Sequence, residues 1–427
     1  MAAVPPSAAA PARSPRYPHY VLAVLVAVNM FNFIDRQIVA ILLQQIKQEF
    51  SATDAQLGLL TGFAFILVHA LIGVPIARYA DRGSRQTVIA IGVAVWSAMT
   101  AFSGAARSFV QLVLLRVGVG IGEAAGTPPS HSLISDYFPP DRRARALSVQ
   151  AIGLYGGIMF GYLAAGWLGQ LLGWRATMVV VGLPGLLLAL LVWRTVDEPP
   201  RPAGDPVPPV REVISYLAAR QSFVILLLAA ALHACAGYGL AQWSPTFLVR
   251  VHGLSYAEVG ATLGLLSGAM GAAGAISGGW LADRLGSRDR RWYAWIAAIA
   301  AFANVPFVAL FLLLDSTALA LACYAPHIFT AGLYTGPLYA MNQGLAKPRM
   351  RATAVALHLL VVGIVGGGVS PWLVGHLSDA FAAEQGSAAL GSALLIVVCA
   401  SSALAGLGYL AASRRLREDL SSAEAIS

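Results

Sequence analysis

The chain has 427 residues, of which 58% are hydrophobic and only 11% are charged, and its mean hydropathy is +0.70. These values exclude a single soluble core with a hydrated surface and indicate an integral membrane protein. The net charge of +8 is explained by membrane topology, as shown below, and not by a nucleic-acid partner.

Apolar stretches long enough to cross a ~30 Å hydrocarbon layer, each needing ~20 helical residues, recur twelve times. Their length and the lack of an alternating in-out pattern favour helices over barrel strands. The predicted spans are 20–45, 54–79, 86–106, 109–135, 145–171, 175–193, 221–246, 256–282, 292–313, 317–343, 352–378 and 388–412. The predicted fold class is an all-α membrane protein with twelve transmembrane helices.

The basic residues predict the orientation of these spans. Of the 28 Lys and Arg residues, 22 lie in the two tails and the even-numbered connections. The odd-numbered connections hold Lys47, Arg107, Arg175 and Arg250. Because Lys and Arg accumulate on the cytoplasmic side, both termini are predicted to be cytoplasmic. The excess of Arg over Lys in an Ala- and Gly-rich chain favours a bacterial inner membrane, that is, a plasma membrane.

The chain repeats itself. "ARYADRGSR" at 77–85 matches "GWLADRLGSR" at 279–288, with Asp81 and Asp283 standing 202 residues apart. "PPDRRARALSVQ" at 139–150 similarly matches "KPRMRATAVALH" at 347–358. Parallel six-helix repeats of this kind build transporters whose substrate site lies near the membrane midplane, where the halves meet.

The repeat and the composition together divide the chain. We expect a disordered cytoplasmic tail over 1–19, a six-helix bundle over 20–193 and a second six-helix bundle over 221–413. The segment 194–220 is rich in Pro and charge, as expected of a cytoplasmic linker, and 414–427 forms the second cytoplasmic tail.

These motifs resemble those of the major facilitator superfamily. "GWLADRLGSR" fits the Gly-x-Leu-Ala-Asp-Arg-x-Gly-x-Arg loop of that family without a gap, whereas the copy at 77–85 has Ala77 in place of Gly. "LLRVGVGIGEAAG" resembles the second family motif, and "GWR" at 173–175 resembles the usual entry to the sixth helix. "NFIDRQIVAIL" together with "RVGVGIGEA" is similar to the Spinster subfamily, whose known members move lysophospholipids or sphingosine phosphates.

Four charged residues fall near the middle of predicted spans: Asp35, Arg36, Arg116 and Glu123. A charge at a helix centre costs ~2.5–3.5 kcal/mol on insertion scales, so these four should face one another or water. Arg116 and Glu123 are seven residues apart, hence on one helix face with a rise of ~10.5 Å between them. Asp35 and Arg36 are consecutive and point in different directions. Asn32 and Arg36 belong to one polar stripe.

The Spinster resemblance implies that Asp35 and Glu123 are proton-responsive and that Arg116 is their partner. Desolvation favours the neutral form of a buried carboxylate and a nearby Arg favours the charged form, so a change of conformation can drive proton uptake and release. The alternative is that the four charges form static ion pairs that join two helices.

The predicted substrate-binding residues combine cations with polar aromatic groups: Arg36, Arg116, Asn32, Tyr238, Trp243 and Tyr334. This set suits an amphiphile whose anionic headgroup meets an Arg and whose tail meets apolar walls. An aromatic packing stripe explains the same aromatic residues. The resemblance further implies gating roles, closing the cytoplasmic side, for Asp81, Arg85, Asp283 and Arg288; the alternative is that they are orientation signals only.

The sequence predicts a proton-coupled secondary transporter that moves a lysophospholipid or similar amphiphilic anion by alternating access, as a monomer without a cofactor or metal. The alternatives are a multidrug or small organic-anion carrier and a membrane receptor that has lost transport. We do not expect an enzyme, because no nucleophile-base set, metal cluster or ATP-binding loop is visible. "GVGIGEAAG" lacks the glycine interval and the preceding strand of a nucleotide-binding loop.

Overall fold

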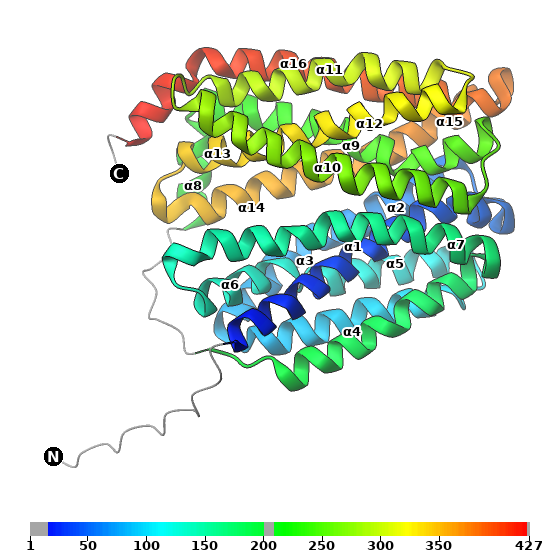
Figure 1. Cartoon of the computed structure of the whole chain (residues 1–427), viewed down its shortest axis with the longest axis horizontal. Helices are drawn as coiled ribbons and strands as arrows, with labels where there is room; N and C mark the ends of the chain where they lie inside the picture. The colour runs from blue at the N-terminus through cyan, green and yellow to red at the C-terminus, as the bar shows by residue number, and fades with distance from the viewer. Residues whose placement is uncertain (1–15, 200–208, 425–427) are drawn as a thin grey trace.

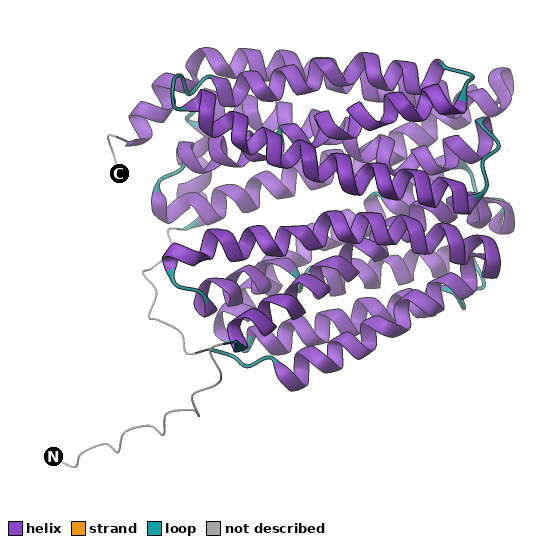
Figure 2. Cartoon of the chain, viewed as in Figure 1, coloured by secondary structure: helices purple, strands orange, loops and turns teal. Residues whose placement is uncertain are grey.

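The computed structural model describes residues 16–199 and 209–424, and within these ranges the chain is helical with short connections and no strand (Figure 2). Helices α1 to α7 form one group, which we call the N group (Figure 1). Its members are α1 (Tyr17–Phe50), α2 (Asp54–Thr61), α3 (Phe63–Arg82), α4 (Arg85–Ser103), α5 (Phe109–Glu123), α6 (Thr127–Tyr137) and α7 (Pro140–Thr195).

Helices α9 to α16 form a second group beside the first, the C group, and the short α8 (Val210–Ala218) packs against α9 and α14. The members of the C group are α9 (Gln221–Val251), α10 (Tyr256–Gly286), α11 (Trp292–Leu313), α12 (Thr317–Leu333), α13 (Thr335–Leu345), α14 (Arg351–Val362), α15 (Ser370–Gln385) and α16 (Ala389–Glu424). A π-helical turn over Gly363–Val369 joins α14 to α15.

The all-α membrane fold is confirmed. In the described ranges, nine helical stretches are long and apolar enough to cross a membrane. Two of them, 145–195 and 353–420, turn back on themselves, at Gly173 with φ 75° and at Gly386–Ala388. Counting these twice gives eleven crossings, and α12 with α13 supplies the remaining predicted span, so the structure is consistent with twelve.

Four of the predicted spans are interrupted helices. The breaks fall at Gly62, at Ala124–Gly126, at Tyr334 and at the π turn. Hydropathy does not detect such breaks, because it averages over a window of residues and does not report backbone geometry. Within a membrane, interruptions are tolerated where protein or a water-lined cavity covers the freed backbone groups.

The predicted domain boundaries also differ locally from the structure. Helix α1 already begins at Tyr17, inside the predicted tail 1–19, and α16 continues to Glu424, beyond residue 413. Helix α8 lies within the predicted linker 194–220, because Val213 and Leu217 are apolar positions that it can bury. Residues 1–15 of the predicted disordered tail and residues 200–208 of the predicted linker lie outside the described residues.

The hydrophobic core joins the two groups at one end only. Arg16 and Glu424, the first and last described residues, lie at what we call the terminal end, and the connections after α1, α9 and α15 lie at the distal end (Figure 1). The largest buried cluster draws on both groups, with Leu43 of α1, Phe247 of α9 and others. Two further large clusters, nearer the terminal end, each belong to one group. The distal end is therefore where the groups share a core.

Close backbone approach at glycines holds the groups together there. A Cβ on Gly260 of α10 would lie 2.4 Å from the carbonyl oxygen of Tyr162 in α7, and a Cβ on Gly375 of α15 would lie 2.1 Å from that of Asp54 in α2. Only glycine permits these contacts. Towards the terminal end, α10 packs against α12 instead, where Gly278 meets Leu333.

We expect Gly260→Ala to lower the thermal stability of the purified protein, because the added methyl group must push α10 away from α7. Overpacking of this kind typically costs about 1–3 kcal/mol. Gly237→Ala in α9 is the matched control, since a Cβ there meets no described atom within 4 Å. Equal melting temperatures for the two variants in a thermal unfolding assay would contradict the prediction.

Candidate functional site

Helices α1 and α5 bring the four predicted charges together in two ion pairs. Asp35 accepts a hydrogen bond from Arg116 Nη1 at 3.0 Å on one carboxylate oxygen and from Thr100 Oγ1 of α4 at 2.5 Å on the other. Asp35 is 4% exposed and Arg116 is 3% exposed. Both members of this pair are therefore buried, and both belong to the N group.

The second pair joins Arg36 to Glu123, whose Oε2 accepts a hydrogen bond from Arg36 Nε at 2.8 Å. The Arg36 side chain is 17% exposed, whereas that of Glu123 is fully buried. The Phe65 ring of α3 lies 5.1 Å from the Arg36 guanidinium and 5.5 Å from that of Arg116. The prediction that Asp35 and Arg36 point in different directions agrees with this geometry, whereas Arg116, the expected partner of both carboxylates, is bonded to Asp35 and not to Glu123 in the described contacts.

The pairing leaves some buried polar atoms unsatisfied. Within the described ranges, Glu123 Oε1 and Arg116 Nε have no hydrogen-bond partner. An unmet buried polar group costs about 1–3 kcal/mol, and more when it is charged. The site therefore has spare capacity for a proton on the carboxylate and for a polar ligand beside the guanidinium.

Arg36 and Arg116 also line a small cavity at the boundary between the two groups. Its volume is about 20 Å³, enough for roughly one water molecule. The N group contributes the two arginines and an apolar wall, and the C group contributes Tyr238, Gln242 and Gly367. The full lining is Arg36, Val39, Thr61, Phe65, Ile66, Arg116, Tyr238, Gln242 and Gly367.

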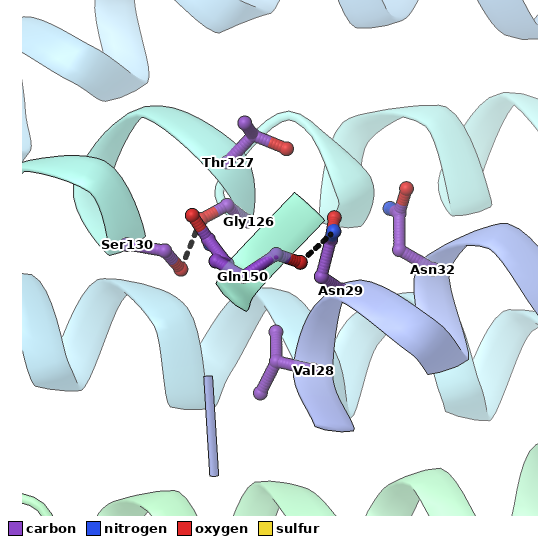
Figure 3. A pocket seen from close by; sticks show the side chains of 7 residues that line it. All are labelled: Val28, Asn29, Asn32, Gly126, Thr127, Ser130 and Gln150. Carbon is purple, nitrogen blue, oxygen red and sulfur yellow. Dashed lines mark hydrogen bonds between the residues drawn. The ribbon is translucent and has the colours of Figure 1, made fainter. Parts of the chain in front are cut away.

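Five of the six predicted substrate residues separate into three sets in the structure. Arg36, Arg116 and Tyr238 line this boundary cavity. Asn32 lines a neighbouring pocket inside the N group (Figure 3). Tyr334 stacks on His233, with 3.8 Å between the ring centroids.

The structure places Trp243 in the packed core, and its assignment to the substrate site stays a prediction. Its side chain is 0% exposed, belongs to the core shared by both groups and donates a hydrogen bond to the Pro371 carbonyl at 2.9 Å. This position agrees with the alternative of an aromatic packing stripe. The sequence gives its position on α9 but not the direction in which its ring points.

An ion network at the distal end links the two groups, and the sequence did not predict it. Asp54, at the start of α2, accepts hydrogen bonds from both Nη atoms of Arg250 at 2.6 and 2.7 Å. It also accepts one from Lys47 at 2.6 Å and one from Ser378 of α15 at 2.7 Å. Asp54 belongs to the N group, whereas Arg250 and Ser378 belong to the C group.

A second carboxylate, which belongs to the C group, binds backbone groups of the N group. Asp379 of α15 accepts the backbone N–H groups of Asp54 and Ala55 at 2.9 and 2.8 Å, so the C group caps a helix of the N group. A carboxylate at a helix N-terminus is favoured by the helix dipole and the free N–H groups. We call Asp54, Arg250 and Asp379 the distal lock. The sequence offered one signal for this network. Lys47 and Arg250 are two of the four basic residues in the odd-numbered connections, where basic residues are scarce.

The predicted gating residues are not part of a contact between the groups that the structure describes. Arg85 binds Ser132 and Asp136 of α6 and Glu198 after α7, all within or next to the N group. Asp283 and Arg288 are exposed, and the side chain of Asp81 lies outside what the structure describes. Their gating role stays a prediction.

The connection after α10 carries a local ion pair instead. Asp289 accepts a hydrogen bond from Arg291 at 2.8 Å. Hydrogen bonds from Arg291 lower the pKa of the half-buried Asp289 carboxyl. The pair stabilises the turn into α11.

Comparison with known proteins identifies the architecture. Residues 25–371 match the family model described as Major Facilitator Superfamily. The chain belongs to this superfamily. It is 36% identical over 410 residues to an MFS-type efflux pump of Mycolicibacterium smegmatis, with 95% of both chains covered. It is 28% identical to human protein spinster homolog 1, covering 86% of this chain and 74% of the relative.

A solved structure agrees closely in shape. The crystal structure of a bacterial homolog of the human lysosomal transporter Spinster, in an inward-facing and unoccupied conformation, has a TM-score of 0.85 and 33% identity. The alignment covers 95% of this chain and 99% of that one. This superfamily member is accordingly a Spinster-like multi-pass membrane transporter and not an enzyme.

We expect Arg250→Met to open the distal end, because it leaves Asp54 without its bidentate partner from the C group. Removing one member of a buried ion pair costs about 3–5 kcal/mol when the other is left unpaired, and the cost here should be smaller because Asp54 keeps Lys47. Spin labels at Ala105 and Ser387, exposed connections of opposite groups, should report longer distances by double electron–electron resonance. The three native cysteines are replaced in this background.

Arg175→Met is the matched control for this experiment. Arg175 pairs with Glu49 at 2.5 Å at the same end, but both residues belong to the N group. Unchanged label distances in Arg250→Met, or equal lengthening in both variants, would show that the distal lock does not hold the groups together.

Proposed function

We propose that this superfamily member is a proton-coupled secondary transporter of an amphiphilic anion, with a lysophospholipid as the most suitable substrate. The observation that carries the proposal is the double contact of Arg36. Its side chain lines the cavity between the two groups, and the same guanidinium is held by the buried carboxylate of Glu123. One cation is thus shared between a proton-binding group and the boundary cavity.

This sharing couples proton binding to anion binding. When Glu123 is ionised, it neutralises Arg36 and competes with any other anion for it. When Glu123 takes up a proton, Arg36 loses its counter-ion and attracts an anionic headgroup from the cavity. By linkage, a bound anion favours protonation of Glu123 by the same factor. Asp35 and Arg116 form the neighbouring pair that keeps the other two charges compensated.

The cavity walls suit an amphiphile. Val39, Phe65 and Ile66 line the cavity next to Arg36 and offer apolar surface to an acyl chain. Tyr238 and Gln242 offer polar groups from the C group, and Gln242 Oε1 has no hydrogen-bond partner in the described part of the chain. A lysophospholipid combines an anionic phosphate with one acyl chain and so matches both kinds of wall.

Alternating access follows from the contacts at the distal end. In our proposal the N and C groups are two six-helix units that rock against each other, and a single chain suffices for the whole cycle. The terminal end, which carries most of the Arg and Lys residues, faces the cytoplasm of a bacterial cell. With the distal end locked, the present structure corresponds to an inward-facing state, in agreement with the conformation of the similar solved structure.

We expect Glu123→Gln to abolish stimulation of transport by a pH gradient, because the amide cannot exchange a proton. Asp35→Asn should reduce the stimulation as well, since it leaves Arg116 uncompensated. The measurement is uptake of a fluorescent lysophosphatidylglycerol into proteoliposomes with and without an imposed pH gradient.

Glu258→Gln provides a matched control. Glu258 belongs to the N-terminal cap of α10, where its carboxylate accepts a hydrogen bond from the Ser255 backbone N–H. It lies on a different helix from the four central charges. Its variant should keep gradient-driven uptake. Full gradient stimulation in Glu123→Gln would refute coupling through this residue.

A multidrug or small organic-anion carrier is the second candidate, favoured by the 36% identity to an MFS-type efflux pump. The two candidates differ in how they depend on the acyl chain. For a lysolipid carrier, competition against labelled lysophosphatidylglycerol should strengthen as the acyl chain of the unlabelled competitor lengthens. Competition by short organic anions, independent of chain length, would favour the second candidate.

A further inference from the structure

The backbone is interrupted directly after the buried carboxylate of Glu123. Helix α5 ends at Glu123 and α6 begins at Thr127, and Pro128 and Pro129 at the start of α6 have no backbone N–H to donate. In membrane transporters, broken helices of this kind mark places where ions are handled. The surroundings of this break therefore bear on how Glu123 exchanges a proton.

A polar pocket lies beside the break, inside the N group (Figure 3). Five of its seven lining residues carry polar side chains: Asn29, Asn32, Thr127, Ser130 and Gln150. The other two are Val28 and Gly126. The polar residues come from α1, α6 and α7, three helices of an otherwise apolar bundle.

The pocket lies one helical turn closer to the terminal end than the Arg36–Glu123 pair. Asn32 precedes Arg36 by one turn on α1, which runs from the terminal to the distal end. Gly126 follows Glu123 by about one turn on the chain that returns towards the terminal end. The pocket is thus placed between Glu123 and the terminal end of the bundle.

Hydrogen-bond accounting indicates what this pocket takes up. Asn29 Nδ2 donates to the Gln150 carbonyl at 3.1 Å, and Ser130 Oγ donates to the Gly126 carbonyl at 2.7 Å. Both amide atoms of Asn32, which is 3% exposed, lack partners within the ranges that the structure covers. The same holds for Oε1 of Gln150, which is 2% exposed.

Water matches these unmet groups better than an ion does. The Asn32 amide has a nitrogen that donates hydrogen bonds and an oxygen that accepts them. A bare cation would satisfy the oxygen only, and an anion the nitrogen only. A water molecule donates and accepts, and ordered water is the usual partner of buried polar groups left unpaired by protein. In this conformation the side chains leave no room for a water molecule between them. Hydration therefore requires the walls to move, and the break between α5 and α6 permits it.

We propose that this polar pocket is a gated water site through which Glu123 exchanges its proton with the terminal side of the membrane. The pocket is closed while Glu123 is paired with Arg36, as in this structure, and this closure prevents protons from leaking past an empty carrier. Release of the pair on protonation lets α6 shift and water enter. This inference rests on the proposed function, because it assumes that Glu123 carries the coupled proton.

Glu123 is the ionisable group next to this route. The other charged or titratable groups around it are Arg36 and Asp35 of α1, Arg116 of α5, and, close to Arg36, His69 of α3 and Tyr238 of α9. None of these five belongs to the described lining of the polar pocket. A change to the lining can accordingly alter proton exchange without removing a charge from the site.

The test is the rate of hydrogen–deuterium exchange at the Glu123 carboxyl, followed by infrared spectroscopy of the full-length protein in lipid. The protonated carboxyl band is assigned by its loss in Glu123→Gln. Asn32→Leu and Gln150→Leu fill the pocket with apolar groups of similar size, and each should slow exchange by roughly tenfold or more, as expected for loss of a proton-transfer partner. Val28→Ala widens the pocket and should speed exchange.

Asn342→Leu in α13 is the matched control. Asn342 is 1% exposed, and both of its amide atoms are likewise unpartnered among the described residues, but it lies in the C group. Its variant should exchange at the wild-type rate. Thermal unfolding of each variant checks that it is folded, and Val28→Ala carries the test in the opposite direction if a leucine variant does not fold.

The outcomes separate the two proposals. Wild-type exchange rates in Asn32→Leu, Gln150→Leu and Val28→Ala, with the Glu123 band present, would overturn the water route and leave proton coupling intact. Equal slowing in Asn342→Leu would also overturn it, because the effect would then not belong to the pocket. Absence of a titrating Glu123 band at any pH would refute the proposed proton coupling itself, and the route with it.

Discussion

The fold depends on the neutralisation of charge inside an apolar bundle. Four ionised side chains near the membrane middle would be costly singly, and the structure compensates them as two pairs made by adjacent residues of α1 with residues two turns apart on α5. These pairs determine how α1 and α5 are rotated relative to each other. They also leave one cation, Arg36, partly exposed at the boundary with the C group. The side chain that neutralises Glu123 is therefore also accessible from the cavity.

The two ends of the bundle are built on different physical principles. At the distal end, glycine contacts, a shared apolar core and crossing carboxylates join the N and C groups. Nearer the terminal end, each group has its own core. A cavity at the boundary is therefore bounded by a rigid seam on one side and by two independently packed units on the other, which is the arrangement that a rocking transporter needs.

Much of this was predictable from the sequence, for physical reasons. Hydropathy and charge asymmetry report directly on the cost of placing residues in a membrane, so the all-α membrane fold and the four buried charges could be predicted. The separate partners of Asp35 and Arg36 followed from helix geometry. Hydropathy cannot report side-chain direction or contacts between distant segments. For this reason the packing of Trp243 in the core and the pairing of Asp54 with Arg250, almost two hundred residues away, were not predicted. The interruption after Glu123 was missed because the span was predicted from averaged hydropathy, although Pro128 and Pro129 were a visible signal of a break.

Lys47 gives the distal lock an asymmetry. When the two groups part, Asp54 loses Arg250 and Ser378 but keeps Lys47, which lies on the same side of the boundary at 2.6 Å. The carboxylate is therefore never stranded, and the electrostatic cost of separation falls on the arginine, which then faces water. A carrier must also return without cargo, and a lock that retains an internal counter-ion lowers the barrier to that step. Lys47, which lies beside the distal lock and need not touch the substrate, would then help to determine the turnover rate.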